Sequence, residues 1–335
     1  MIISQIVLHQ PIGVLRLRTD TGAEGHCTGV VTPVSDLDTV SSVLLNSNPL
    51  DRERLWCALK NVEGELAPNL CSGIDVALWD LSSKIAGRSV CAHVHNFRDS
   101  IPVCQIGTEG VETQEIVQEA REAQLAGFKA YRFHAAADEQ SLICLIRAVR
   151  EAVGPDFPLM FDGRTRCMVD EAIRIGRALD DEDYFCFNNP RPNNDHTGGR
   201  QVSCEIDTPT SAGVSNPMET AQVMTTQSAD HVRTSVRCSG GFTDVLKSAR
   251  CAEAFGAYCH LNGLGICDGF AHLHLVGASR NSPFFEMNRY KTISPFVQNP
   301  LQVHNGFAQV PDSPGLGIEL DLDAVNEHTV TMIKT

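Results

Sequence analysis

The stretch Leu159-Met160-Phe161-Asp162-Gly163-Arg164 is a short apolar run that ends in a carboxylate and a turn. A helical pattern follows it, with small or apolar residues at Val169, Ala172, Ile173 and Gly176. A strand that ends in an acid and leads through a turn into a helix is typical of α/β folds, whose chemistry lies at the carboxyl ends of buried parallel strands. We therefore regard Asp162 as a candidate site residue. The alternative is that Asp162 only caps the turn that follows it.

Segments of the same kind recur along the chain at intervals of roughly 23 to 29 residues, the spacing that a repeated strand-and-helix unit requires. They begin near Ile101, Ala130, Leu159, Tyr184, Thr208, His231, Ala257 and Pro283. Helical patterns lie between them, most clearly over residues 142–153 and 242–252. This repeat predicts an α/β fold built as a barrel of strands and helices.

The residues before the repeat are organised differently. Residues 2–8 and 14–19 read as strands joined by a short turn, and residues 51–59 and 72–85 read as helices. In the second helix, Ser72 is the expected N-cap and Gly87 lies just past the expected end. Strands followed by helices predict a small α+β unit ahead of the barrel.

Composition excludes several classes of function. The chain has 335 residues and a formal net charge of −14, which argues against nucleic acid and anionic membranes as partners. No apolar run comes close to the roughly 20 residues that span a bilayer, and the N-terminus lacks the layout of a secretory signal. The 13 cysteines form no Cys-x-x-Cys pair, and their odd number favours free thiols in a reducing compartment. We expect a cytoplasmic protein.

Six segments of the chain carry a resemblance to one family. They are residues 72–80 (Ser-Gly-Ile-Asp-Val-Ala-Leu-Trp-Asp), 127–134 (Gly-Phe-Lys-Ala-Tyr-Arg-Phe-His), 185–190, 239–241, 253–256 and 314–317. In this order they resemble the enolase superfamily, specifically the branch of mandelate racemase and muconate lactonizing enzyme. The resemblance covers nearly the whole chain. It implies a modified TIM barrel with a capping domain over the barrel mouth, and a homo-oligomer.

The resemblance also divides the chain. It implies an α+β capping domain over residues 1–98, a catalytic barrel over residues 99–300, and a C-terminal segment over residues 301–335 that returns to the cap or seals the barrel. Members of the family insert a mobile lid loop after the first strand, whereas this chain has only a few residues there. We therefore expect an open barrel mouth, suited to a larger substrate or to chemistry that need not exclude water.

Metal binding is the first point at which the chain departs from the family pattern. The resemblance places three carboxylate ligands of Mg²⁺ at the ends of the third, fourth and fifth barrel strands, and these positions are Asp162, Asn188 and Val214. Mg²⁺ demands hard oxygen ligands. Because two of the three carboxylates are missing, we expect that the protein uses no metal cofactor.

The catalytic bases that the resemblance implies have changed as well. The second-strand Lys-x-Lys of the family reads Arg132-Phe133-His134, its sixth-strand acid falls on Ser235, and its seventh-strand histidine falls on Asn262. Because alternate residues of a strand share a face, we expect Arg132 and His134 to point together into the barrel. Imidazole titrates near neutrality, so His134 is the candidate proton-transfer group, with Arg132 holding the substrate oxygen.

Further polar residues at the expected strand ends are candidates for binding the substrate. They are Asp162, Arg164, Asn188, Arg233, His260, Asn262 and Glu286. Arginine holds carboxylates in a planar fork, so the three arginines of this ring indicate a small organic acid or a related anion as the ligand. The alternatives are that Arg132 only neutralises Asp162, and that the histidines and Glu286 are interior residues held by hydrogen bonds.

Three functions remain open. The first is a metal-independent enzyme that moves a proton on a small carboxylate or carbonyl substrate, with a lyase, cycloisomerase or racemase outcome. The second is a non-catalytic pseudoenzyme or ligand-binding protein on the same scaffold, and the third is a metal enzyme with relocated ligands such as Asp162, Asn188 and His260. The ionisable His134 favours the first function, whereas Val214 and Ser235 are typical of a decayed site.

Overall fold

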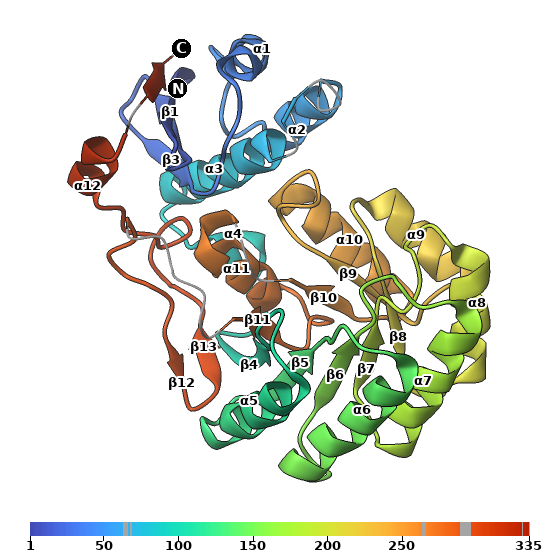
Figure 1. The fold of residues 1–335 in the computed structure, drawn as a ribbon. Helices are drawn as coiled ribbons and strands as arrows, with labels where there is room; N and C mark the ends of the chain where they lie inside the picture. The colour runs from blue at the N-terminus through green and yellow to red at the C-terminus, as the bar shows by residue number, and fades with distance from the viewer. Residues whose placement is uncertain (63–65, 68, 263–265, 289–295, 330, 335) are drawn as a thin grey trace.

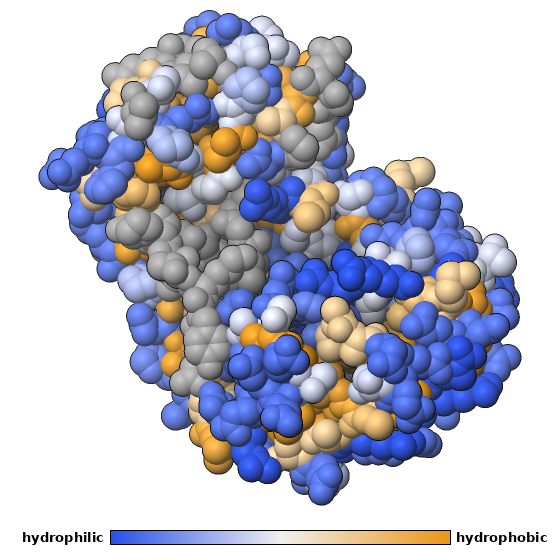
Figure 2. Space-filling model, in the orientation of Figure 1, coloured by the Kyte–Doolittle hydropathy of each residue, from blue (hydrophilic) through white to orange (hydrophobic). Residues whose placement is uncertain are grey.

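The computed structural model describes residues 1–62, 66–67, 69–262, 266–288, 296–329 and 331–334. Figure 1 shows two bodies of secondary structure, an N-terminal unit and a ring of strands surrounded by helices. Both ends of the chain lie in the N-terminal unit, so the chain leaves this unit, builds the ring and comes back. Figure 2 shows the same face of the molecule, on which hydrophilic residues predominate and a notch at the right of the view lies between the two bodies.

Eight parallel strands form the ring. They are β4 (Ser100–Ile106), β5 (Ala130–Phe133), β6 (Leu159–Asp162), β7 (Cys186–Asn188), β8 (Thr210–Gly213), β9 (His231–Thr234), β10 (Cys259–Leu261) and β11 (Phe285–Met287). Neighbours pair in chain order, and β11 closes the ring by pairing with β4. All eight strands begin within two residues of the positions predicted from the sequence. The predicted α/β class and TIM-type barrel are therefore confirmed.

Helices cover the outside of the barrel. They are α5 (Thr113–Leu125), α6 (Glu139–Val153), α7 (Val169–Asp181), α8 (His196–Glu205), α9 (Pro217–Thr226), α10 (Phe242–Ala254) and α11 (Phe270–Ala278). Between strands and helices, Phe161 packs against Phe133 and Phe187, with ring centroids 5.4 and 5.7 Å apart. Each aromatic ring buries a large apolar area, so this layer stabilises the barrel from outside.

The residues that alternate with these phenylalanines point into the barrel. Ala130, Met160 and Cys186 form a small apolar cluster there together with Cys104. Two residues further along the same strands come Arg132, Asp162 and Asn188, which are also buried. The polar side chains at the carboxyl ends of the strands therefore stand directly above an apolar floor.

The N-terminal unit is an antiparallel sheet covered by helices. Its strands are β1 (Ile3–Gln10), β2 (Val14–Thr19), β3 (Glu24–Cys27) and β14 (Thr331–Lys334), and its helices are α1 (Val34–Leu44), α2 (Arg52–Lys60), α3 (Leu70–Ile85) and α4 (Val90–Val94). Residues 11–13 alone connect β1 to β2, in place of a lid loop. The expectation that Ser72 caps α3 is wrong, because the helix begins at Leu70 and the Ser72 hydroxyl donates to the Asn69 carbonyl.

Helix α3 joins the N-terminal unit to the barrel through buried hydrogen bonds. The Asp75 carboxylate accepts from the Thr243 amide at 2.8 Å and from its hydroxyl at 2.7 Å. The Trp79 indole donates to the same hydroxyl at 2.9 Å. Asp80 accepts from the amide of Leu316 at 2.8 Å. Buried polar groups must be paired, so Asp75 and Trp79 of segment 72–80 act here as contacts between the N-terminal unit and the barrel helix α10.

The chain after residue 300 contacts both bodies. Strand β13 (Phe307–Gln309) pairs with the barrel strand β4 and with β12 (Val303–His304). Helix α12 (Leu322–Glu327) follows, and β14 then pairs with β1. The domain boundaries at residues 98 and 300 stay a prediction. In the described part of the chain, no helix combines the length and the apolar character needed to cross a membrane.

Candidate functional site

A cavity of about 390 Å³ opens at the carboxyl ends of the barrel strands. Seven residues named from the sequence line it, namely Arg132, Asp162, Arg164, Val214, Arg233, Ser235 and Asn262. Most of the lining side chains can donate or accept hydrogen bonds, so this first cavity suits a polar ligand.

Two of the arginines are already paired with acids inside the barrel. Arg132 Nη1 lies 2.5 Å from Asp162 Oδ2, and Arg132 Nε lies 3.4 Å from Glu286 Oε2. Arg233 donates to both carboxylate oxygens of Glu286, at 2.7 and 2.5 Å. All four side chains are buried. Two positive and two negative charges therefore balance within the barrel, as burial of charge requires.

The protonation of Glu286 follows from this pairing. Burial alone raises the pKa of its carboxyl, but the positive charges of Arg233 and Arg132 outweigh burial and bring the pKa to about 2. Burial likewise opposes the charge of Arg233, and Glu286 outweighs it, so the pKa of the guanidinium rises. The pair is ionised at neutral pH and is not a proton donor or acceptor there.

Asp162 has the two roles that its sequence context left open. Its Oδ1 accepts a hydrogen bond from the Arg164 amide at 3.0 Å, which caps the turn after β6. The Asn189 side-chain amide approaches the same oxygen at 3.4 Å. Its Oδ2 pairs with Arg132. Both carboxylate oxygens are therefore occupied within the protein.

His134 does not point into the barrel beside Arg132, contrary to the expectation from strand alternation. Strand β5 ends at Phe133, so the pleat that would place residues 132 and 134 on one face stops one residue too early. His134 instead lines a second cavity, of about 790 Å³, formed by the loops after β4, β5 and β6. Asp162 and Arg164 line both cavities, so the two are neighbours.

The His134 ring is held by Arg164, whose Nη2 lies 2.9 Å from His134 Nε2 and 2.9 Å from Glu109 Oε1. A guanidinium has no acceptor, so Nε2 accepts and the proton of the neutral ring lies on Nδ1. Burial lowers the pKa of His134, and the charge of Arg164 lowers it further. His134 is therefore uncharged near neutral pH, and its Nε2 lone pair is occupied.

The turn that carries Arg164 has an unusual backbone. Arg164 and Thr165 both adopt left-handed conformations, with φ of 55° and 60°. Side chains other than glycine, asparagine and aspartate rarely occupy this region, least of all β-branched ones. The Asp162 carboxylate and the Asn189 carbonyl, which accepts from the Thr165 amide at 2.8 Å, hold the turn in place. Such strain is concentrated at functional sites.

Three other residues named from the sequence lie below the first cavity and do not line it. Besides Glu286, they are Asn188 and His260, both buried. The side-chain oxygen Oδ1 of Asn188 accepts from the Ser211 hydroxyl at 2.6 Å. Burial lowers the pKa of His260 to about 3, and its ring packs among Phe185 and Tyr258. His260 is thus a neutral interior histidine, the alternative that the sequence left open.

Sequence reasoning missed several residues of the two cavities. Asn189, Asn193, Ser215, Glu219 and Cys238 line the first cavity, and Glu109 lines the second. Glu219 lies in the first turn of α9, and the others belong to loops after strands, where no periodic pattern marks a residue as inward-facing. Asn189 could have been identified, because it follows Asn188 in segment 185–190.

The three positions that the family resemblance assigns to Mg²⁺ have the following surroundings in this arrangement. Asp162 Oδ2 contacts Arg132, the Asn188 oxygen accepts from Ser211, and Val214 has no polar side-chain atom. Across the described ranges of the chain, no three His, Cys, Asp or Glu side chains are grouped to hold a metal ion. Asp162 and His260, two of the relocated metal ligands considered from the sequence, are therefore not grouped with a third residue of these four types.

Comparisons with known proteins agree with the fold. A model of the family described as enolase C-terminal domain-like matches residues 115–324. D-galactarolactone cycloisomerase of Agrobacterium fabrum is 27% identical over 329 residues, which cover 90% of this chain and 86% of that protein. L-talarate/galactarate dehydratase of Salmonella typhimurium is 26% identical over 300 residues, which cover 85% of this chain and 73% of that protein.

Solved structures of similar fold include two dehydratases. D-glucarate dehydratase from Agrobacterium tumefaciens, complexed with magnesium, has a TM-score of 0.87 and 24% identity over 99% of this chain and 100% of that one. L-talarate dehydratase from Polaromonas sp. JS666, complexed with Mg and L-glucarate, has a TM-score of 0.88 and 22% identity over 100% of this chain and 99% of that one.

These comparisons contradict the expectation that no metal cofactor takes part, because both dehydratase structures contain magnesium. That expectation rested on counting protein carboxylates at Asp162, Asn188 and Val214. Mg²⁺ usually keeps several waters and binds through one or two carboxylates together with substrate oxygens. The loss of two carboxylates is therefore too weak a criterion for excluding the ion.

Proposed function

This chain belongs to the enolase superfamily, in the branch of mandelate racemase and muconate lactonizing enzyme, and we propose that it is an enzyme that removes the proton next to the carboxylate of a small hydroxylated acid. The observation that carries the proposal is the polar cavity at the carboxyl ends of the barrel strands, with Arg164 at its edge. Relatives named for galactarolactone, talarate and galactarate support a sugar acid or its lactone as the substrate class.

Arg164 is the residue that we assign to the substrate carboxylate. Breaking a buried ion pair such as Arg233–Glu286 costs about 3–5 kcal/mol when one partner is lost, so Arg132 and Arg233 are not free to bind a ligand. The Arg164–Glu109 pair is exposed, with 43% and 72% of the two side chains accessible. Exposed pairs contribute little, so a substrate carboxylate can compete with Glu109 for the guanidinium.

The hydroxyl groups of the substrate have further partners in the lining of the first cavity. Asn189, Asn193 and Ser215 line it and offer both donors and acceptors. Proton removal next to a carboxylate places negative charge on a substrate oxygen, and nearby donors and positive charge stabilise it. We assign this task to Arg164 and to the carboxamides of Asn189 and Asn193.

His134 is the residue that we assign to proton transfer. It is uncharged near neutral pH and lines the second cavity, in contact with Arg164, which lines both cavities. A neutral imidazole is suited to accept a proton near pH 7. Return of the proton racemises or exchanges the substrate, loss of a neighbouring hydroxyl makes the enzyme a dehydratase, and opening of a ring makes it a cycloisomerase.

The test is deuterium exchange into candidate acids. The full-length protein is incubated in D2O with galactarate, glucarate, gluconate and galactarolactone, with magnesium chloride present because solved relatives contain this ion. Proton NMR then records loss of the signal next to the carboxylate and any product. Exchange or turnover of at least one compound supports the proposal, and neither binding nor exchange of any of them contradicts it.

A specific observation favours a second function, that of a ligand-binding protein without catalysis. Arg132 and Arg233 are neutralised by acids, and the Nε2 lone pair of His134 is occupied by Arg164. The same experiment separates the two functions. Binding of an acid, seen as a rise in the melting temperature, without exchange or turnover would support the binding protein.

A further inference from the structure

Arg164 occupies the boundary between the two cavities, and its guanidinium has two partners there. Arg164 Nη2 lies 2.9 Å from His134 Nε2, on the loop after β5, and 2.9 Å from Glu109 Oε1, on the loop after β4. Asp162, at the end of β6, fixes the backbone of the turn. Three consecutive strand ends therefore meet at one guanidinium, and what this group binds decides the state of His134.

The side chain of Arg164 can change partners while its backbone stays in place. The Asp162 carboxylate and the Asn189 carbonyl hold the amides of residues 164 and 165. The side chain itself is 43% exposed and Glu109 is 72% exposed, whereas Arg132 and Arg233 are buried in ion pairs. Of these three arginines, Arg164 is the one that a carboxylate from solution can reach and draw away from its partners.

The bond from Arg164 to His134 has a chemical consequence. Imidazole Nε2 has a single lone pair, and the guanidinium N–H occupies it. A base whose lone pair accepts a hydrogen bond cannot take a proton from carbon until that bond is released. In this arrangement, Arg164 fixes the orientation of the His134 ring and prevents its Nε2 from accepting a proton.

We propose that Arg164 is a carboxylate-operated latch on His134: an acid that enters the first cavity draws the guanidinium from His134 and Glu109 to its own carboxylate and thereby frees His134 Nε2 for proton transfer. This inference rests on the proposed function, since it takes His134 as the base. In the step that follows, the C–H bond next to the carboxylate breaks, its electron pair stays on the substrate as an enolate, and the proton forms an N–H bond at Nε2. The imidazolium returns the proton in the reverse step.

A latch differs from a residue that merely positions His134, and the kinetics of Arg164→Gln separate them. Loss of a charge-assisted contact to the carboxylate raises KM at least roughly tenfold. The same variant also loses a positive charge that we assign to the enolate, so kcat falls while KM rises, whereas loss of a residue that only positions His134 lowers kcat alone. A fall of kcat by about a hundredfold with unchanged KM would mean that Arg164 positions His134, and it would overturn the latch. Glu109→Gln removes the competing carboxylate and should lower KM with kcat unchanged.

NMR of the His134 ring gives a readout that does not depend on turnover. Protein labelled with ¹³C-histidine is titrated with pH, and the His134 signal is identified by its loss in His134→Gln. A latch predicts that saturating galactarate raises the pKa of His134 in wild type, because the guanidinium leaves the ring. In Arg164→Gln the pKa should already be higher without ligand, and galactarate should not raise it further.

The outcomes keep the latch and the proposed function apart. Exchange of galactarate by wild type without any change at the His134 ring refutes the latch and leaves the function standing. A galactarate-induced change at the ring without exchange supports the latch and refutes catalysis on this acid. If neither galactarate nor glucarate binds, exchanges or shifts the ring signal, both inferences fail.

Discussion

Arg233 and Glu286 are joined inside the barrel by two hydrogen bonds, Nη1 to Oε1 at 2.7 Å and Nη2 to Oε2 at 2.5 Å. The two residues come from β9 and β11, two strands that are not neighbours in the ring. Glu286 also attracts Arg132, which links the pair to Asp162. The four buried side chains therefore form a connected series of alternating negative and positive charges inside the barrel.

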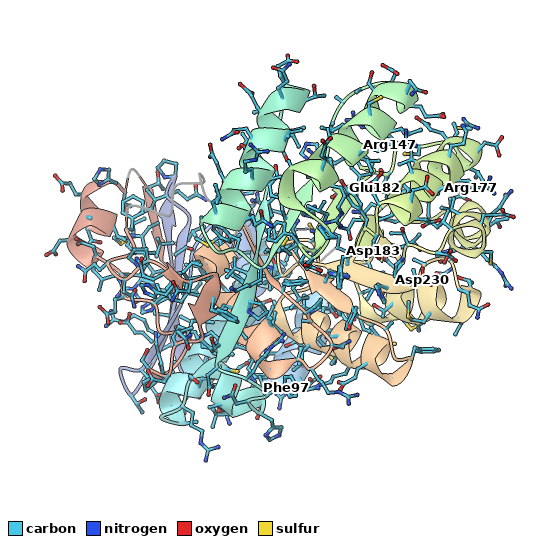
Figure 3. All side chains as sticks on the ribbon, turned by 90° about the horizontal axis from the view of Figure 1, so that it is seen from below. Phe97, Arg147, Arg177, Glu182, Asp183 and Asp230 are labelled. Carbon is cyan, nitrogen blue, oxygen red and sulfur yellow. The ribbon has the colours of Figure 1, made fainter. Side chains whose placement is uncertain are left out.

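We predict that Glu286→Gln destabilises the protein by about 3–5 kcal/mol, because it leaves two buried guanidinium groups with only one carboxylate between them. Urea unfolding followed by circular dichroism measures the loss. The matched control is Glu182→Gln on the outer helical layer, where Arg147 and Glu182, both labelled in Figure 3, form a partly exposed pair at 3.9 Å. This control should change the free energy of unfolding by less than about 1 kcal/mol. Equal effects of the two variants would contradict the prediction.

The barrel and the inward register of these charges could be predicted from the sequence, because they depend on local patterns. Short apolar runs mark the strands, and alternation puts Arg132, Asp162 and Arg233 on the inner face. The pairing could not be predicted in the same way. Arg233 and Glu286 are 53 residues apart in the chain, and only the closed ring decides which buried charge lies opposite which.

Two predictions from the sequence were wrong, and both concerned residues at the ends of regular elements. His134 was expected beside Arg132, but β5 stops at Phe133 and the side chain turns to the second cavity. Ser72 was expected to cap α3, but the helix starts two residues earlier. Alternation and capping rules hold within regular elements, and boundaries are set by tertiary contacts that one sequence does not reveal.

A second prediction concerns pH and the contact between the two bodies. Burial raises the pKa of Asp75 to about 7, although hydrogen bonds from Thr243 and the charge of Arg52 oppose the rise, and Asp244 adds to it. In the unfolded chain the pKa is about 3.9. Between these values the folded protein holds a proton that the unfolded chain has lost, so stability contributed by Asp75 is present below about pH 4 and is lost as the pH rises to 7.

The measurement is the free energy of unfolding from pH 4 to 8 in wild type and in Asp75→Asn. Asparagine does not titrate, so the difference between the two proteins isolates the contribution of Asp75. It should change by at most about 1.4 kcal/mol for each pH unit and level off above pH 7. Parallel pH curves for the two proteins would show that Asp75 titrates normally in the fold.

A third prediction concerns the strained turn. Thr165 is β-branched and has a φ of 60°, a conformation that costs an L-residue about 1–2 kcal/mol. Glycine adopts it without this cost, so Thr165→Gly should raise the free energy of unfolding by about 1 kcal/mol after the larger entropy of the unfolded glycine is subtracted. Thr165→Ala keeps the strain and should show no such gain. If alanine stabilises as much as glycine, the backbone of the turn is not strained.

The last prediction tests the base directly. His134→Gln should retain the fold and the binding of an exchangeable acid, because glutamine can still accept from Arg164 at the edge of the cavity. It should lose exchange by about a hundredfold or more, since glutamine cannot take a proton. In wild type the exchange rate should fall as the pH drops below the pKa of His134, which burial and Arg164 set below the ordinary value.

His260→Gln is the matched control, because this histidine is buried beneath the cavity and already neutral. Fast exchange by His134→Gln together with loss of exchange in a stably folded His260→Gln would move the base to His260.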